Sequence, residues 1–173
     1  GETQVLSLAT LGTLGEAQLQ RELQSLQVFA DTLRDALAEP PLPPQTHSLQ
    51  FMLDGEPWQL QWSFADLRPS GLLRWRYAPT RAGDRMAAWL QHLALCAARP
   101  AGVAARTRWL SSDGEFSLAA CGDAAAQLQQ AVQLATDRRM TPVLIAPNDL
   151  PQGCLRASAP CTAPNPHEPH ELA

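Results

Sequence analysis

Apolar residues at helical spacing mark the first expected element. Leucines and one alanine recur at steps of four and three from residue 19 to residue 37, which predicts a helix with a single apolar stripe. Thr13 and Glu16 have capping-box spacing and predict the start of this helix. The run EPPLPP at residues 39–44 predicts its end, because proline cannot continue a helix. The stripe either packs on its own domain, which we favour, or forms a two-stranded coiled coil.

The next segment alternates with a period of two, which is typical of strands with one buried face. Residues 48–53 and 58–64 alternate apolar and polar side chains, and Asp54-Gly55 between them is a turn signal. A second turn at residues 68–71 leads to a strand at residues 72–77. Residues 48–77 are therefore expected to form a three-strand antiparallel meander.

The remaining periodic segments predict two more helices and three more strands. We expect helices at residues 80–98 and from residue 123 onward, strands at 107–111 and 115–119, and a short buried strand at 142–147. Residues 148–173 are rich in proline and have no periodicity, so we interpret them as an extended tail or loop pieces. The expected fold class is α/β (α+β), a mixed sheet flanked by helices, with one domain at residues 1–150 and an irregular tail at 151–173.

The composition excludes some catalytic mechanisms and argues against some binding modes. All 13 basic residues are arginine, so every mechanism that needs a lysine amine is excluded. The net charge of −4 argues against a broad electrostatic grip on nucleic acid, so any DNA contact is local or shared with a partner. Four widely spaced cysteines and no apolar run long enough to span a bilayer favour a cytoplasmic protein with reduced thiols.

The element order resembles the restriction-endonuclease-like fold of PD-(D/E)xK nucleases. That resemblance implies a metal-binding acid on one strand and an acid-x-Lys triplet on the next, where side chains two residues apart share a face. The triplet position holds Arg74-Trp75-Arg76, and the first acid position falls near Gln61. A cation at residue 74 repels Mg²⁺, and Asp66 is the only acid nearby. We therefore expect a degenerate site with no catalytic residue and no cofactor.

Four segments in order resemble the RecC C-terminal domain family: residues 70–76, 89–97, 109–115 and 142–147. The resemblance extends over about residues 10–150. It implies the RecC subunit of exodeoxyribonuclease V, the RecBCD helicase and nuclease, with a nuclease fold but no nuclease activity in this domain. It further implies contacts with the RecB and RecD subunits and a part in guiding DNA during double-strand break repair by homologous recombination.

Several side chains are candidates for contact with DNA or a partner protein. They are Arg74, Arg76, Arg106, Arg108 and Trp89. Basic residues beside an aromatic ring can bind single-stranded DNA, but the same residues also suit a solvated strand face or a protected edge strand. Two other functions stay open, an active metal-dependent nuclease and a protein-interaction module with no DNA contact. Zinc is disfavoured, because Cys154, Cys161, His167 and His170 lack the usual finger spacing.

Overall fold

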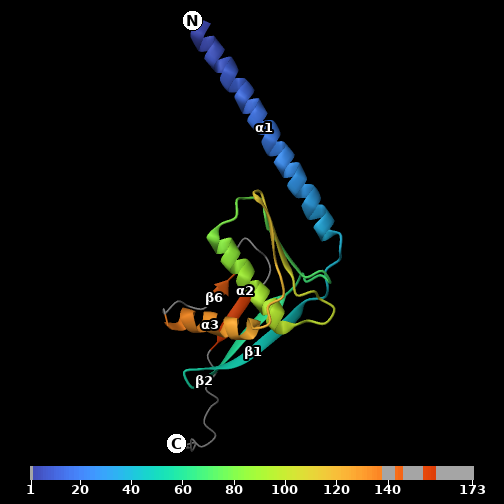
Figure 1. Ribbon diagram of the computed structural model, residues 1–173, viewed down its shortest axis with the longest axis vertical. Helices are drawn as coiled ribbons and strands as arrows, with labels where there is room; N and C mark the ends of the chain where they lie inside the picture. Colours follow the sequence, from blue (N-terminus) through green and yellow to red (C-terminus); the bar gives the residue numbers. More distant parts are fainter. Residues whose placement is uncertain (1, 138–142, 146–153, 159–173) are drawn as a thin grey trace, which may run out of the picture.

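The computed structural model describes residues 2–137, 143–145 and 154–158. Within these residues the chain forms three helices and seven strands (Figure 1). The helices are α1 (Glu2–Leu37), α2 (Ala82–Ala98) and α3 (Ala124–Asp137). The strands are β1 (Gln45–Leu53), β2 (Glu56–Phe64), β3 (Leu72–Arg76), β4 (Thr107–Ser111), β5 (Gly114–Leu118), β6 (Val143–Ile145) and β7 (Cys154–Ser158). The expected mixture of helices and strands is confirmed.

The described strands form two sheets. One has the order β1-β2-β7-β6 with every neighbouring pair antiparallel. The other has the order β3-β4-β5 and is mixed, because β3 pairs in parallel with β4 while β4 pairs antiparallel with β5. Helix α2 contacts β1, β3, β4 and α3, so it joins the two sheets into one body.

The expected three-strand meander is wrong in its third strand. β1 and β2 form the predicted hairpin, but β3 pairs with β4 rather than with β2. The cause lies in the turn before β3. Gly71 has φ +117°, and an added Cβ there would lie 2.1 Å from the Arg106 carbonyl oxygen. This close approach lets the Leu72 N–H donate to the same oxygen at 2.9 Å, so the chain leaves the turn alongside β4.

The main hydrophobic core lies between the β1-β2 hairpin, α2 and α3. The inward residues of β2 meet apolar side chains of both helices, as the period-two pattern of β2 predicts. Trp62 is buried, and Trp58 is half-buried nearer the hairpin turn. The buried members are Leu60, Trp62, Phe64, Leu67, Leu72, Leu93, Ala94, Leu95, Cys96, Ala124, Leu128 and Val132.

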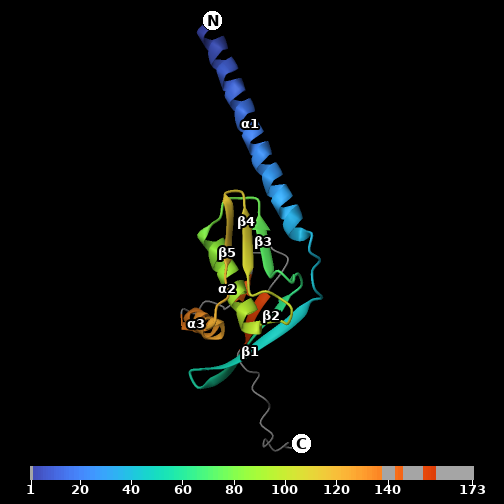
Figure 2. The same ribbon diagram turned by 45° about the vertical axis from the view of Figure 1, so that its right-hand side comes forward.

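Helix α1 differs from the expectation in two ways. It begins at Glu2, so Thr13 and Glu16 lie inside the helix rather than at its start. It also projects from the rest of the molecule (Figures 1 and 2), and Leu19, Leu23 and Leu26 are 59%, 50% and 44% exposed. The favoured interpretation, that this apolar stripe packs on its own domain, is therefore wrong for these three leucines.

One strand lies in the segment that was expected to be irregular. Residues Cys154–Ser158 form β7, which pairs with β2 on one side and β6 on the other. Five residues are too few for the alternation Cys-Leu-Arg-Ala-Ser to stand out among the surrounding prolines. The rest of the predicted tail, residues 148–153 and 159–173, lies outside the described residues.

Candidate functional site

The arginines of β3 point toward α2. The parallel register with β4 sets Arg74 opposite Trp109 and Arg76 opposite Ser111, on the sheet face that α2 covers. Helix α2 follows β3 as the crossover to β4, and it contacts Arg76 through Asp84 in its first turn and Arg74 through Gln91 further along. Figure 2 shows α2 lying against this sheet. Arg74 is therefore buried in the interior, whereas Trp75 and Arg76 are only partly buried.

Arg74 is an interior cation with several partners. The residue is 2% exposed, and its Nη1 donates to Asp66 Oδ2 at 2.6 Å and to the Leu73 carbonyl at 3.0 Å. Its Nε donates to Gln91 Oε1 at 2.6 Å. Burial lowers the pKa of the guanidinium, while the Asp66 carboxylate opposes that shift and favours the charged form. Strand β3, the turn before it and α2 thus meet at one charged centre.

The carboxylate that faces the triplet is Asp66, not a residue at position 61. Gln61 is exposed in the other sheet, where its strand neighbours are Ser48 and Arg156. The expected placement of the first acid near Gln61 depends on β2 and β3 being adjacent. Because β3 pairs with β4 instead, Gln61 does not lie beside Arg74. Within the described residues, the second oxygen of Asp66, Oδ1, is buried without a hydrogen-bond partner.

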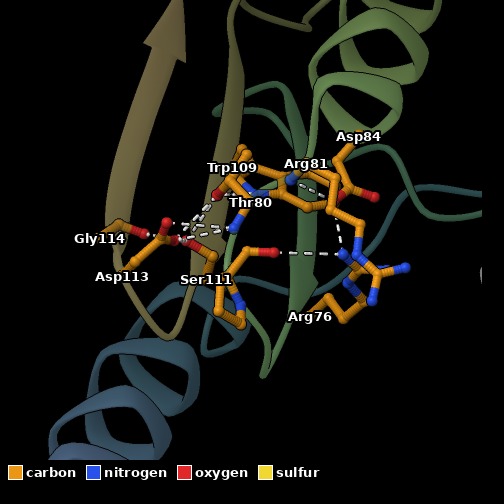
Figure 3. Close-up of polar contacts among 9 residues, drawn as sticks. Arg76, Thr80, Arg81, Asp84, Trp109, Ser111, Asp113 and Gly114 are labelled. Atoms are coloured by element: carbon orange, nitrogen blue, oxygen red, sulfur yellow. Dashed lines mark hydrogen bonds and ion pairs between the residues drawn. The ribbon is translucent and has the colours of Figure 1, made fainter.

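Arg76 joins the same strand to the start of α2 (Figure 3). Its Nη2 donates to Asp84 Oδ2 at 2.5 Å and to the Pro79 carbonyl at 3.3 Å. Asp84 also accepts a hydrogen bond from the Arg81 N–H at 2.8 Å, and an acid in the first turn suits the helix dipole. The Arg76 side chain is 32% exposed, so part of it remains at the surface.

A second polar cluster ties the β3–α2 loop to the β4–β5 turn (Figure 3). Asp113 accepts hydrogen bonds from Ser111 Oγ at 2.5 Å and from the Thr80 N–H at 3.1 Å, and these bonds lower the pKa of the Asp113 carboxyl. The Trp109 indole N–H donates to Thr80 Oγ1 at 3.2 Å. The sequence predicts strands on both sides of this turn but gives no indication that Thr80 reaches it.

His92 lies in the interior, next along α2 from Gln91, which binds Arg74. It is fully buried, with Nδ1 2.9 Å from Thr107 Oγ1 and Nε2 2.7 Å from the Ala119 carbonyl oxygen. A carbonyl only accepts, so Nε2 carries the proton and Nδ1 accepts from the threonine hydroxyl. Burial lowers the pKa of His92, which keeps the ring neutral. These contacts are those of a structural histidine.

The other candidate contact residues are distributed over the surface. Arg106 is exposed and donates to Ser117 Oγ at 3.3 Å. Arg108 donates to Glu115 Oε2 at 3.1 Å, and its side chain is 32% exposed. Trp89 is half-buried against the core, with its ring centre 5.9 Å from that of His92. Arg74 must be removed from the surface candidates, because its guanidinium is used inside the fold.

Two further findings concern only the part of the chain that the structure describes. It contains no group of three or more histidine, cysteine or acidic side chains arranged to hold a metal ion. The possible zinc ligands Cys161, His167 and His170 lie outside it. No described helix has the length and apolar character needed to cross a bilayer.

Fold and site together define an α/β domain whose central charged groups are arginine–aspartate pairs. A sequence model of the RecC C-terminal domain matches residues 7–149. Because this match covers most of the chain, the chain belongs to the RecC C-terminal domain family. Membership associates it with the exodeoxyribonuclease V (RecBCD) complex. A search of curated proteins returned no match.

Proposed function

We propose that this chain is a non-catalytic domain of RecC that provides subunit docking and DNA guidance in exodeoxyribonuclease V. In this proposal residues 1–150 form the domain, the partners are the RecB and RecD subunits, and the setting is cytoplasmic repair of double-strand breaks by homologous recombination. Family membership supports the assignment to the complex. The contacts of Arg74 support the absence of catalysis.

The Arg74–Asp66 pair is the observation that carries the non-catalytic assignment. A two-carboxylate metal centre at this place would need a second acid at position 74. Position 74 instead supplies a guanidinium, whose Nη1 lies 2.6 Å from Asp66 Oδ2. The other nearby acid, Asp84, is bound to Arg76 at 2.5 Å. Both carboxylates are therefore neutralised by arginine, which disfavours an active metal-dependent nuclease.

DNA guidance in this proposal depends on a few local arginines. Arg108 lies on β4, Arg106 directly precedes that strand, and Arg76 is partly exposed at the end of β3. The net charge of −4 favours weak binding that depends on the rest of the complex. The same charge, with Arg108 paired to Glu115, also favours the second candidate, a protein-interaction module with no DNA contact.

A cleavage assay with Mg²⁺ tests the non-catalytic assignment. The purified domain is expected to leave linear and forked DNA intact. Robust cleavage that disappears in Asp66→Asn, with folding confirmed by circular dichroism, would overturn the proposal. Arg34→Gln serves as the matched control, because it alters an exposed arginine on α1 that takes no part in the Arg74–Asp66 pair, and it is expected to leave any cleavage unchanged.

Salt-dependent DNA binding separates guidance from pure docking. In the assembled complex, the double change Arg106→Gln and Arg108→Gln is expected to weaken forked-DNA binding and to reduce its salt dependence. Arg34→Gln on α1 is the control, since that exposed arginine lies on another element and already pairs with Asp31. Unchanged DNA binding together with intact RecB and RecD association would favour the interaction-only function.

A further inference from the structure

The apolar stripe of α1 lies on a different side of the helix from the side that contacts its own domain, and its first half is exposed while Ala30, Leu33 and Leu37 are half-buried. Its members recur at steps of four, three, four, three and four, and the first three are the exposed leucines Leu19, Leu23 and Leu26. The helix meets its own domain through another side, where the Phe29 ring lies 5.2 Å from that of Tyr77. The stripe is made of Leu19, Leu23, Leu26, Ala30, Leu33 and Leu37.

A groove identifies the side of α1 that the domain uses. Ser25, Phe29 and Thr32 line it from the helix, facing Leu110 and Ser111 of β4. At about 100° per residue, this side and the centre of the stripe lie roughly a third of a turn apart around the helix. The stripe is therefore a second contact surface of α1, separate from its attachment to the sheet.

The spacing of the stripe specifies a helical occupant. Alternating steps of three and four place apolar side chains along a seam that another helix fills with knobs-into-holes packing. A strand presents apolar side chains with a period of two, which does not match steps of three and four. A small molecule would require a closed pocket rather than an open line of leucines. Such packing would also stabilise α1, because helices in proteins owe most of their stability to packing of an apolar face.

We infer that the α1 stripe packs against a helix of the RecC polypeptide that precedes this domain in the same subunit. The matched family is, by its description, the C-terminal domain of RecC, so such a polypeptide exists in RecC proteins. The outer end of α1 points away from the sheets (Figure 1), which leaves the exposed leucines accessible to a helix from outside this domain. Attachment through one chain gives that segment a millimolar effective concentration that a separate subunit lacks.

The chemistry of the stripe also fits a permanent contact. The exposed part contains only leucines, and permanent interfaces are more apolar than transient ones. This inference rests on family membership and on the geometry of α1. It does not rest on the absence of catalysis, so nuclease activity would leave it intact.

Site-specific photo-crosslinking in the full RecC subunit, assembled with its partners, tests the inference. A benzophenone amino acid replaces Leu23, and mass spectrometry identifies the crosslinked peptide. The matched control is the same replacement of Leu134 on α3, which is 57% exposed but belongs to no leucine stripe. The expected product joins α1 to an upstream RecC peptide, with several-fold higher yield than the control gives.

The other outcomes overturn the inference. A crosslink to another subunit or to a second RecC copy assigns the stripe to a different occupant. Absence of a crosslink, or an equal upstream yield from position 134, removes the specific contact. As a second readout, amides of residues 19–26 are expected to exchange several-fold more slowly in the full subunit than in the subunit carrying Leu19→Asp, Leu23→Asp and Leu26→Asp. Equal exchange rates contradict the inference.

Discussion

Helices α1 and α2 use their side chains in opposite ways. Helix α2 buries Asp84, Gln91 and His92 beside its leucines. Helix α1 exposes Leu19, Leu23 and Leu26, and none of its described side chains is buried. The difference shows that burial follows the supply of partners rather than the polarity of the residue. Each of these polar residues of α2 meets a complementary group on a strand or loop, whereas Leu19, Leu23 and Leu26 of α1 stay accessible to solvent.

The largest loss of stability is expected when a buried polar residue of α2 loses its partner. Arg74→Ala leaves Asp66 as an unpaired buried carboxylate and leaves Gln91 Oε1 without its donor. We expect a loss of about 3–5 kcal/mol in the free energy of unfolding, measured by urea denaturation. The double variant Asp66→Leu and Arg74→Met should lose much less, because it removes both charges. Equal losses in the two variants would contradict a buried ion pair.

His92 should give a smaller effect with a distinct pH dependence. His92→Gln disturbs the bonds to Thr107 and Ala119 and is expected to cost about 1–3 kcal/mol at neutral pH. The folded protein lowers the pKa of His92, so the unfolded chain takes up the proton first. The contribution of the neutral His92 ring to the free energy of unfolding is fully present above the unfolded pKa of about 6.5 and is lost as the pH falls below it.

Urea midpoints measured between pH 5 and 8 check this pH dependence. The slope should be shallower in His92→Gln than in the parent protein. Burial also lowers the pKa of His47, so part of the slope should remain in that variant and disappear when His47→Gln is added. An unchanged slope in His92→Gln would show that the ring is not held neutral by the fold.

The loop that leads into α2 should show a moderate effect. Thr80→Val removes the acceptor for the Trp109 indole N–H, which lies in a nearly fully buried side chain. We expect a loss of about 1 kcal/mol by thermal or urea unfolding. Thr46→Val is the control, because its bond to Ser63 is exposed and its removal should have less effect. A larger loss at Thr46 would argue against the role of the Thr80 cluster.

The smallest effect is expected on α1. In the isolated chain, the exposed leucines have little to lose, so Leu23→Asp should change the free energy of unfolding by no more than about 0.5 kcal/mol. Leu93→Asp, at a buried position of α2, is the contrasting change and should prevent stable folding. Circular dichroism and urea unfolding of both variants check this. Strong destabilisation by Leu23→Asp would mean that the stripe packs within this chain.

Local structure was largely predictable from the sequence. The period of two predicted β1 and β2, and the remaining periodic segments predicted α2, α3, β4 and β5 close to where they lie. The pairing of β3 was not predictable, since it depends on the approach of Gly71 to the Arg106 carbonyl from a distant segment. The stripe of α1 was recognised, but its exposure was not predictable, because spacing defines an apolar face and not the partner of that face.

The candidate site was predicted in part. The cation at position 74 was recognised, and Asp66 was noted as the only acid nearby. The contacts of Arg74 with Asp66 and Gln91, and of Arg76 with Asp84, had no sequence signal, because each joins residues on different elements. Arginine on the polar side of a strand ordinarily indicates that this side faces solvent. Here α2 covers that side of β3 and buries Arg74.

The late position of β7 has a consequence for folding. Strand β2 pairs with β1 across a two-residue turn, but its other edge has no partner until residues Cys154–Ser158 have been synthesised. At ribosomal rates of about 5–20 residues per second, that edge stays open for several seconds after β2 has been made. An open strand edge rich in tryptophan and leucine can pair with other nascent chains. Timely synthesis of this last strand is therefore a safeguard against aggregation, and truncation before residue 154 should lower the soluble yield.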